Sequence, residues 1–176
     1  MSSPAQATVA VVTGCSSGIG KTLALAFATR GITVVATTRR VESLERLTAE
    51  HDNIIPMPLG LGNLGSLEQF RDAVAEKTGG RVDIPVNNTG AHYSSTAMDL
   101  EIAEAEKLFA VNVFVVMRLC QLFLPLLHKS ARGCIVQIGS VTRDVPVTWQ
   151  YVYNASKAAL SQYTKTLRLA SLSSPT

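Results

Sequence analysis

Short apolar runs rich in β-branched residues alternate along this chain with longer amphipathic stretches. The period of the apolar positions predicts strands at residues 8–12, 32–37, 53–58, 82–86 and 134–138. It predicts helices at residues 19–29, 41–50, 64–77, 98–127 (where a break is left open) and 152–169. Because strands and helices alternate and the connections are too long for hairpins, the pattern favours an α/β fold with a five-stranded, doubly wound parallel sheet.

The high apolar content agrees with such a sheet. Hydrophobic residues make up 47% of the chain, and strands buried on both faces are apolar throughout. The most apolar stretch, residues 111–127, is interrupted by Asn112, Arg118, Gln121 and Pro125. It is also shorter than the roughly 20 apolar residues that a spanning helix needs. We therefore expect a buried or interface helix there and no transmembrane segment.

Nothing in the 176 residues divides the chain into several domains. We expect one domain over residues 1–169 and an unstructured tail at residues 170–176, where the sequence becomes polar and featureless. Pro85 is the one residue poorly suited to its predicted strand, because it lacks the N–H that a central strand donates.

Charge and cysteines exclude several functions. The net charge of +3 and the scattered Lys and Arg residues argue against a nucleic-acid partner. Cys15, Cys120 and Cys134 have no metal-ligand spacing, so we expect no metal site and buried free thiols in a reducing compartment. The N-terminus lacks the basic start of a signal peptide. These features together favour a cytoplasmic location.

A glycine-rich loop, T-G-C-S-S-G-I-G, joins the first predicted strand to the first helix. Gly14 permits a tight turn, Gly18 lets the backbone approach a diphosphate, and Gly20 allows the helix to pack closely on the sheet. The helix N-terminus offers N–H groups and a positive dipole end to phosphate, and Ser16 and Ser17 add hydroxyl donors. A glycine triplet alone also suits an ordinary strand-to-helix turn, but its position here predicts nucleotide binding.

The end of the second strand bears on the choice of dinucleotide. An acidic residue there would bind the ribose 2′-hydroxyl of NAD, but this segment reads Ala-Thr-Thr-Arg-Arg. Arg39 and Arg40 can instead hold the 2′-phosphate of NADP, with Thr38 as a further donor. The alternative is two solvated arginines at the start of a helix. The pattern favours NADP(H).

Tyr153 and Lys157 are the candidate proton-transfer pair. A phenol is a poor acid–base catalyst at neutral pH, and a cation beside it stabilises the phenolate. Positions i and i+4 share a helix face, so Lys157 lies beside Tyr153, whereas Tyr151 has Ala155 at that position. Ser140 follows the fifth strand, at the sheet edge where ligands bind, and can polarise a substrate carbonyl. A surface pair without function is the alternative for these two residues taken alone.

Taken together, these residues resemble the short-chain dehydrogenase/reductase family. The loop at 13–20 matches its Thr-Gly-x-x-x-Gly-x-Gly, and residues 87–90 resemble its Asn-Asn-Ala-Gly. The resemblance covers nearly the whole chain and implies a Rossmann-like fold that binds NADP(H). It implies four catalytic residues: Ser140, Tyr153, Lys157 and Asn112, the last holding a proton-relay water. The implied cofactor contacts are Gly14, Ser16, Ser17, Gly18, Ile19, Gly20, Thr38, Arg39, Arg40, Asn88, Gly90, Tyr153 and Lys157.

Finer features, such as G-C-S-S-G-I-G and W-Q-Y-V-Y-N-A-S-K, resemble the fungal NADPH-dependent 1-acyldihydroxyacetone-phosphate reductase branch. Similar sequences serve as tailoring reductases in fungal secondary metabolism. The resemblance implies reduction of a ketone to a secondary alcohol, the small-molecule substrate being an acyldihydroxyacetone phosphate or a fungal metabolite. It also implies a homo-oligomer formed through the 98–127 and 152–169 helices, and peripheral association with endoplasmic reticulum or lipid droplets.

The chain also departs from the family pattern. Gly60 stands where the family has an Asp that contacts adenine, Thr89 replaces an alanine, and Val115 replaces a glycine. Family members are usually longer, so we expect this chain to lack the C-terminal strands and the substrate lid. Its fifth strand would then be an exposed edge that pairs readily with other chains.

Two functions therefore stay open. The first is an NADPH-dependent reductase, and the second is a nucleotide-binding or dimer-forming remnant of one with weak or no catalysis. A sugar-nucleotide epimerase of the extended branch is disfavoured, because its loop resembles Thr-Gly-x-x-Gly-x-x-Gly, a spacing that differs from Gly14, Gly18 and Gly20.

Overall fold

The computed structural model describes residues 7–62 and 64–173, with the side chains described as far as residue 170. The start of the chain, where we expected no signal peptide, and the last three residues of the predicted tail lie outside the described residues. The chain forms two compact units. The first unit comprises Met1–Thr89 and Arg118–Val136, and the second comprises Gly90–Met117 and Gln137–Thr176.

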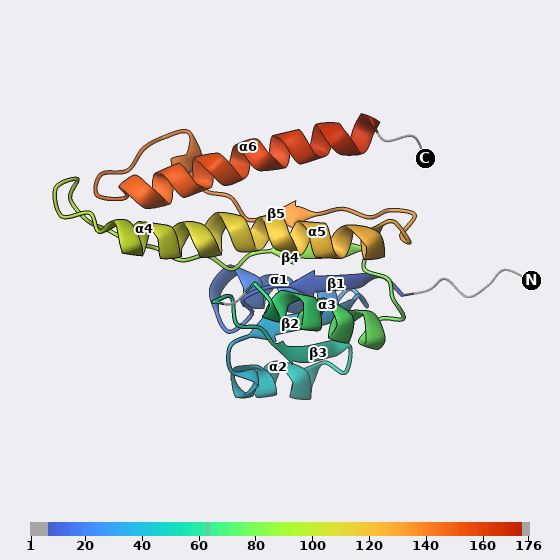
Figure 1. The fold of residues 1–176 in the computed structure, drawn as a ribbon. Helices are drawn as coiled ribbons and strands as arrows, with labels where there is room; N and C mark the ends of the chain where they lie inside the picture. The colour runs from blue at the N-terminus through green and yellow to red at the C-terminus, as the bar shows by residue number, and fades with distance from the viewer. Residues whose placement is uncertain (1–6, 63, 174–176) are drawn as a thin grey trace, which may run out of the picture. The chain divides into compact units, whose positions relative to one another are not determined.

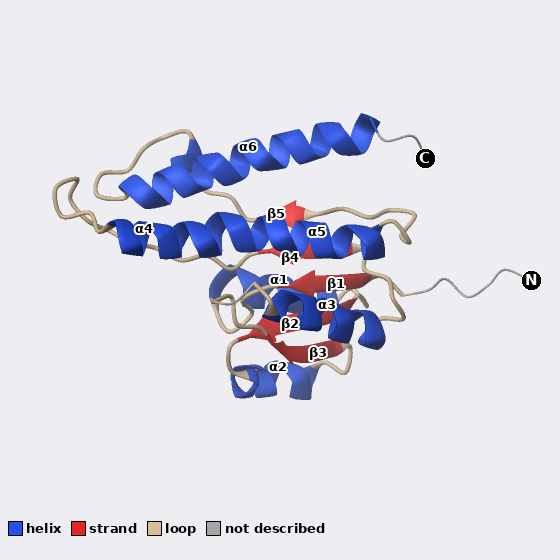
Figure 2. Cartoon of the chain, in the orientation of Figure 1, coloured by secondary structure: helices blue, strands red, loops and turns tan. Residues whose placement is uncertain are grey.

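A parallel sheet organises the first unit (Figure 2). Its strands are β1 (Val9–Val12), β2 (Thr33–Thr38), β3 (Ile54–Pro58), β4 (Ile84–Asn87) and β5 (Val136–Gln137). Their order is β3-β2-β1-β4-β5. The later strands therefore add on the other side of β1, as in a doubly wound sheet. The predicted fold class is confirmed. The helices of this unit are α1 (Gly18–Ala28), η1 with α2 (Val41–Leu44 and Glu45–Glu50), α3 (Ser66–Lys77) and most of α5 (Val115–Leu127).

The sheet is buried on both faces. Val34 and Val35 are consecutive residues of β2, and both are fully buried. Because successive side chains of a strand point to opposite faces, both faces of β2 are covered. Phe70 of α3 meets Phe123 of α5 edge to face, with ring centroids 6.0 Å apart. This burial explains the high apolar content of the chain.

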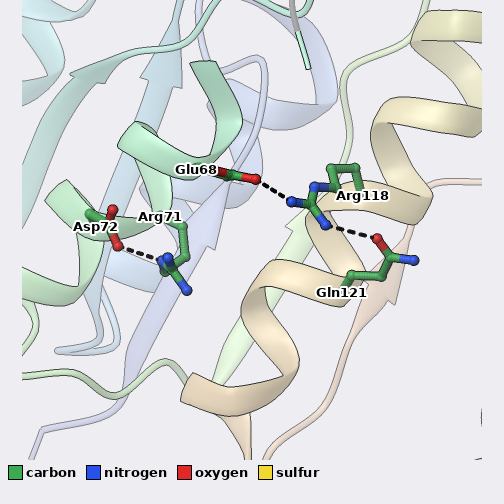
Figure 3. A network of polar contacts seen from close by, with 5 residues as sticks. All are labelled: Glu68, Arg71, Asp72, Arg118 and Gln121. Carbon is green, nitrogen blue, oxygen red and sulfur yellow. Dashed lines mark hydrogen bonds and ion pairs between the residues drawn. The ribbon is translucent and has the colours of Figure 1, made fainter. Parts of the chain in front are cut away.

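Polar contacts join α3 to α5 at the surface of the same unit (Figure 3). The Arg118 guanidinium donates to the Glu68 carboxylate and also to the Gln121 side chain, the latter at 3.2 Å. Arg118 therefore interrupts the apolar run of α5 because it lies on the exposed side of that helix. Exposed pairs of this kind contribute about 0–1 kcal/mol to stability.

Pro85 lies within β4, opposite Val11 of β1, and the pairing continues through Val86 and Val12. The Thr13 N–H donates to the Val86 carbonyl at 3.0 Å, so the residue after the proline carries the bond to the neighbouring segment. The strand therefore tolerates a residue that we considered poorly suited to it.

The second unit is mainly helical. It contains α4 (Ile102–Phe109), the π-helical turn η2 (Ala110–Phe114), the short helix η3 (Val141–Arg143) and the long helix α6 (Tyr151–Ser173). Helix α6 packs against α4, η2 and η3, and Figure 1 shows α4 and α6 side by side. Helix α6 runs four residues beyond its predicted end, so residues 170–173 are helical although we expected an unstructured tail.

One continuous helical stretch, Ile102–Leu127, covers most of the predicted 98–127 helix, and the turn η2 joins α4 to α5 without the break that we left open. The stretch is long and apolar enough to cross a membrane, which our shorter estimate of 111–127 missed. Half of its most apolar window is buried in the protein. Length and composition alone are weak support for a membrane span, since core helices share them.

Candidate functional site

The glycine loop follows β1 and is held by a network of backbone contacts. Gly14 has φ +74°, a conformation that favours glycine. A Cβ on Gly20 would lie 2.3 Å from the Gly14 carbonyl oxygen and 2.4 Å from the Asn88 amide nitrogen, so only glycine fits there. The Asn88 side chain donates to the carbonyls of Thr13 at 2.8 Å and Gly14 at 3.2 Å. Asn88, predicted to touch the cofactor, thus braces the loop.

The outer side of this loop is open. Gly18 has φ +56°, and a Cβ placed on this glycine would meet no atom within 4 Å. Ser16, Ser17 and Ile19 are exposed. Helix α1 begins at Gly18, and the first N–H groups of a helix have no partner within it. An open glycine, two hydroxyls and a helix N-terminus at one point fit the diphosphate of a dinucleotide.

The thiols differ in burial. Cys15, inside the glycine loop, is fully buried, donates to the Val12 carbonyl at 3.1 Å, and its pKa is raised by burial to about 11. It therefore stays protonated and unreactive. Cys120 is also a buried free thiol. The prediction is wrong for Cys134, which is exposed because the chain enters β5 only at Val136.

The end of β2 forms the second part of the predicted cofactor site. The Thr38 hydroxyl is 3.1 Å from the Ser43 hydroxyl and accepts from the Arg40 N–H at 3.4 Å. Arg39 and Arg40 follow with exposed side chains. The turn therefore presents two guanidinium groups beside two hydroxyls, a set that can bind a phosphate. Gly60, after β3, has no atom within 4 Å of its virtual Cβ, so packing does not require glycine there.

In the second unit, Asn112 lies in η2 and is buried. Its Oδ1 accepts from the Ala91 N–H at 2.7 Å, and its Nδ2 donates to the Ala91 carbonyl at 3.0 Å and the Ser156 hydroxyl at 3.1 Å. Ser156 in turn donates to the Tyr153 carbonyl at 2.8 Å. Asn112 thereby links η2, the segment after Gly90 and helix α6.

Lys157 is the most buried charged side chain near these groups, with 5% exposure. Its Nζ donates to the Ile138 carbonyl at 3.0 Å and lies 5.7 Å from the centre of the Tyr153 ring. Burial lowers the pKa of this ammonium below its ordinary value. A Cβ on Gly90 would lie 3.7 Å from Nζ and 3.4 Å from Asn112 Oδ1. Gly90, Asn112, Tyr153 and Lys157 are therefore gathered in one place.

Ser140 caps the short helix η3 of the same unit. Its Oγ accepts from the Thr142 N–H at 3.2 Å and from the Thr142 hydroxyl at 2.9 Å. Because both bonds use its oxygen as acceptor, its own hydrogen can be donated to another group. This arrangement suits a hydroxyl that polarises a carbonyl.

A comparison with protein families identifies the family to which this chain belongs. The family model for short chain dehydrogenases matches residues 8–173. This chain belongs to the short-chain dehydrogenase family. The family is one of oxidoreductases that use nicotinamide cofactors.

Two of the similar curated proteins come from fungi. The chain is 41% identical over 161 residues to the short-chain dehydrogenase virD of Hypocrea virens, covering 91% of this chain and 55% of that protein. It is 38% identical over 160 residues to the NADPH-dependent 1-acyldihydroxyacetone phosphate reductase of Schizosaccharomyces pombe, covering 90% of this chain and 53% of that protein. The chain thus spans little more than half the length of these relatives.

Solved structures of short-chain dehydrogenases have the same fold. A Streptomyces avermitilis enzyme superposes with a TM-score of 0.88 at 32% identity, covering 94% of this chain and 61% of its own. A metagenomic short-chain oxidoreductase in complex with NADP superposes with a TM-score of 0.85 at 31% identity, covering 91% and 74%.

Sequence reasoning missed two residues that contact the site residues, His92 and Ser156, and one unusual backbone conformation, that of Trp149. His92 stacks at a tilt on Tyr153, with ring centroids 5.2 Å apart. Ser156 joins Asn112 to the Tyr153 backbone. Trp149 has a φ of +63°, which is rare for a bulky residue. Of these residues, only Ser156 could have been predicted from the sequence, because it lies one helical turn after Tyr153. Among residues 7–62 and 64–173, no cluster of His, Cys, Asp and Glu could hold a metal ion.

Proposed function

We propose that this chain is an NADPH-dependent reductase that converts a ketone to a secondary alcohol. The observation that carries the proposal is the buried Lys157 ammonium, fixed by the Ile138 carbonyl 5.7 Å from the Tyr153 ring. A cation held near a phenol stabilises the phenolate that remains after the phenol has given up its proton. The pair is therefore suited to proton donation at neutral pH.

The proposed reaction assigns one step to each residue. When bound, reduced nicotinamide would supply the hydride for the carbonyl carbon. Ser140 donates its hydrogen to the carbonyl oxygen and orients it, and Tyr153 transfers its proton to that oxygen as the alcohol forms. Lys157 stabilises the phenolate and holds the nicotinamide ribose, and Asn112 supports the relay that returns a proton to Tyr153.

The cofactor contacts proposed for the first unit follow from its glycine loop and the turn after β2. The loop from Gly14 to Gly20, with Ser16 and Ser17, binds the diphosphate. Thr38, Arg39 and Arg40 bind the 2′-phosphate, which is why we propose NADP(H) rather than NAD(H). The NADPH-dependent relative and the solved complex with NADP support this choice.

Tyr153→Phe tests the proposal directly. We expect this variant to lose nearly all NADPH oxidation with a ketone while it keeps cofactor affinity, because the hydroxyl supplies the proton and little binding. Tyr151→Phe is the matched control, since Tyr151 is exposed and has Ala155 in place of a lysine. Turnover and cofactor fluorescence are the two measurements. A Tyr153→Phe protein with ordinary turnover would assign the proton to another group.

A second candidate function is nucleotide binding without catalysis. The glycine loop and the Asn88 side chain that braces it lie within the first unit, so we expect cofactor affinity to depend little on the Tyr153 hydroxyl. Acyldihydroxyacetone phosphate is one proposed substrate, supported by the name of the Schizosaccharomyces pombe relative. Cofactor binding without turnover of this ketone or any other would favour the second function.

We also propose a homo-oligomer formed through the 98–127 and 152–169 helices. Ile102 and Phe114 in this stretch are large apolar side chains with 66% and 51% exposure, and a partner would remove them from water. Analytical ultracentrifugation of the parent and of a Phe114→Ser variant tests this. A parent that stays monomeric over the whole concentration range would contradict it.

A further inference from the structure

Trp149 combines two unfavourable features. Its φ of +63° places it in the left-handed region, where a bulky side chain costs free energy that glycine does not. Its side chain is 63% exposed, so little burial within this chain offsets that cost. Backbone outliers of this kind are concentrated at functional sites. Trp149 is also the only tryptophan of the sequence.

The indole lines an open pocket of about 260 Å³ together with Ser94, Ser95 and Thr96. All four residues belong to the second unit. The pocket walls are tied to each other, because the Ser95 N–H donates to the Trp149 carbonyl at 3.0 Å. Since an indole ring and three small hydroxyl-bearing residues line it, the pocket suits a flat apolar group that carries a polar atom at one edge.

Hydrogen bonds also hold the two segments that carry the lining residues. On one side, the Glu101 N–H donates to the Tyr93 hydroxyl at 3.1 Å, and the Thr96 hydroxyl donates to Asp99 at 2.5 Å. On the other side, the Asn154 amide donates to the Val147 carbonyl at 2.9 Å, which closes the turn that carries Trp149. The pocket is therefore largely preformed, and a ligand need not order its walls.

The same two segments carry the proposed proton donor. His92 lies two residues before the pocket residues, and Tyr153 lies four residues after Trp149. The His92 ring packs at a tilt against the Tyr153 ring. The segments 92–96 and 149–153 thus touch twice, once at the pocket and once at the tyrosine. A substrate whose carbonyl reaches Tyr153 can place its remaining bulk against Trp149.

We propose that Trp149 determines substrate specificity and that the pocket receives an uncharged, planar unsaturated group of the ketone. This inference rests on the proposed reductase function. The lining contains no charged residue, and Thr96 is bonded to the Asp99 carboxylate, which repels a phosphate. Of the two substrate classes that the family resemblance implies, the pocket therefore favours a fungal metabolite with an aryl or conjugated ketone over acyldihydroxyacetone phosphate.

A binding experiment without cofactor tests the pocket independently of catalysis. The indole N–H of Trp149 gives one resonance in a ¹H–¹⁵N spectrum of the full chain. Acetophenone should shift it saturably, about three- to tenfold tighter than cyclohexyl methyl ketone, which has the same number of non-hydrogen atoms but no flat ring. Dihydroxyacetone phosphate should not shift it. Equal affinities, a preference for the phosphate, or a shift with protein concentration alone would each overturn the proposal.

Two variants separate a binding role from a structural one. Trp149→Gly removes the ring but tolerates the positive φ, so it should fold at least as stably as the parent and lose the preference for the flat ketone. Trp149→Phe keeps a ring and should retain part of that preference in kcat/KM. A selectivity ratio unchanged in Trp149→Gly would refute the role of Trp149. If no ketone is turned over, the proposed function fails, but the proposed ligand preference of the pocket can still be tested. Ligand-induced protection against unfolding then compares the binding preference of Trp149→Gly with that of the parent.

Discussion

At the scale of single residues, Gly20 is where packing leaves no freedom. Gly20→Ala places a Cβ within 2.4 Å of a backbone oxygen and of the Asn88 amide. We expect a loss of about 1–3 kcal/mol in the free energy of unfolding, as for other overpacked sites. Gly60→Ala is the matched control, because its virtual Cβ meets no atom within 4 Å, and it should change stability by less than about 0.5 kcal/mol. Urea unfolding of both variants measures the difference, and equal stabilities would contradict the close approach.

Arg39 is the residue on which cofactor choice should depend. Losing a charge-assisted contact to the 2′-phosphate should cost about 1.5–3 kcal/mol, or about tenfold to a hundredfold in NADPH affinity. Arg39→Ala should therefore narrow the preference for NADPH over NADH, as measured by fluorescence titration. Arg46→Ala, which removes an exposed arginine paired with Glu50 of the same unit, controls for net charge. Equal affinity of the parent for both cofactors would refute the assignment.

The buried ammonium of Lys157 should make stability depend on pH. Burial lowers its pKa from 10.5 in the folded chain, so between the folded value and 10.5 the unfolded chain binds more protons. Stability therefore rises with pH through that window. The parent should gain stability relative to Lys157→Met as pH rises toward 10.5, measured by urea unfolding. Lys165→Met, at an exposed position of α6, corrects for the loss of a lysine charge. A parent that loses stability relative to Lys157→Met would reverse the sign of the argument.

At the scale of elements, the π-helical turn η2 depends on one side chain. Asn112 fills the place where α4 meets α5 and bonds to both backbone groups of Ala91. Asn112→Leu leaves these groups without their partner, so we expect a loss of about 1–3 kcal/mol in unfolding free energy. Urea midpoints of the parent and of Asn112→Leu check the prediction, and a leucine variant as stable as the parent would contradict it.

At the scale of the whole molecule, the two compact units share continuous elements. Helix α5 passes from the second unit to the first after Met117, and β5 passes back after Val136. Because neither unit can unfold without disrupting a helix or strand that it shares with the other, we expect both units to unfold in one transition. Trp149 fluorescence reports on the second unit and far-ultraviolet circular dichroism on both. The two curves should coincide, and separate midpoints would show independent units.

The local patterns of the sequence were sufficient for the order of strands and helices, the glycine loop and the Tyr153–Lys157 pair, because each depends on spacing within one element or one turn. Tertiary contacts decided the rest. Pro85 fits a central strand because the bond to the next segment falls on Val86, and the stretch Ile102–Leu127 stays continuous because Asn112 supports a π-helical turn. Trp149 meets a segment more than fifty residues away in the sequence, because its carbonyl accepts from the Ser95 N–H. No period or motif within one segment records such a contact, so the pocket that we propose for the substrate became visible only in the folded chain.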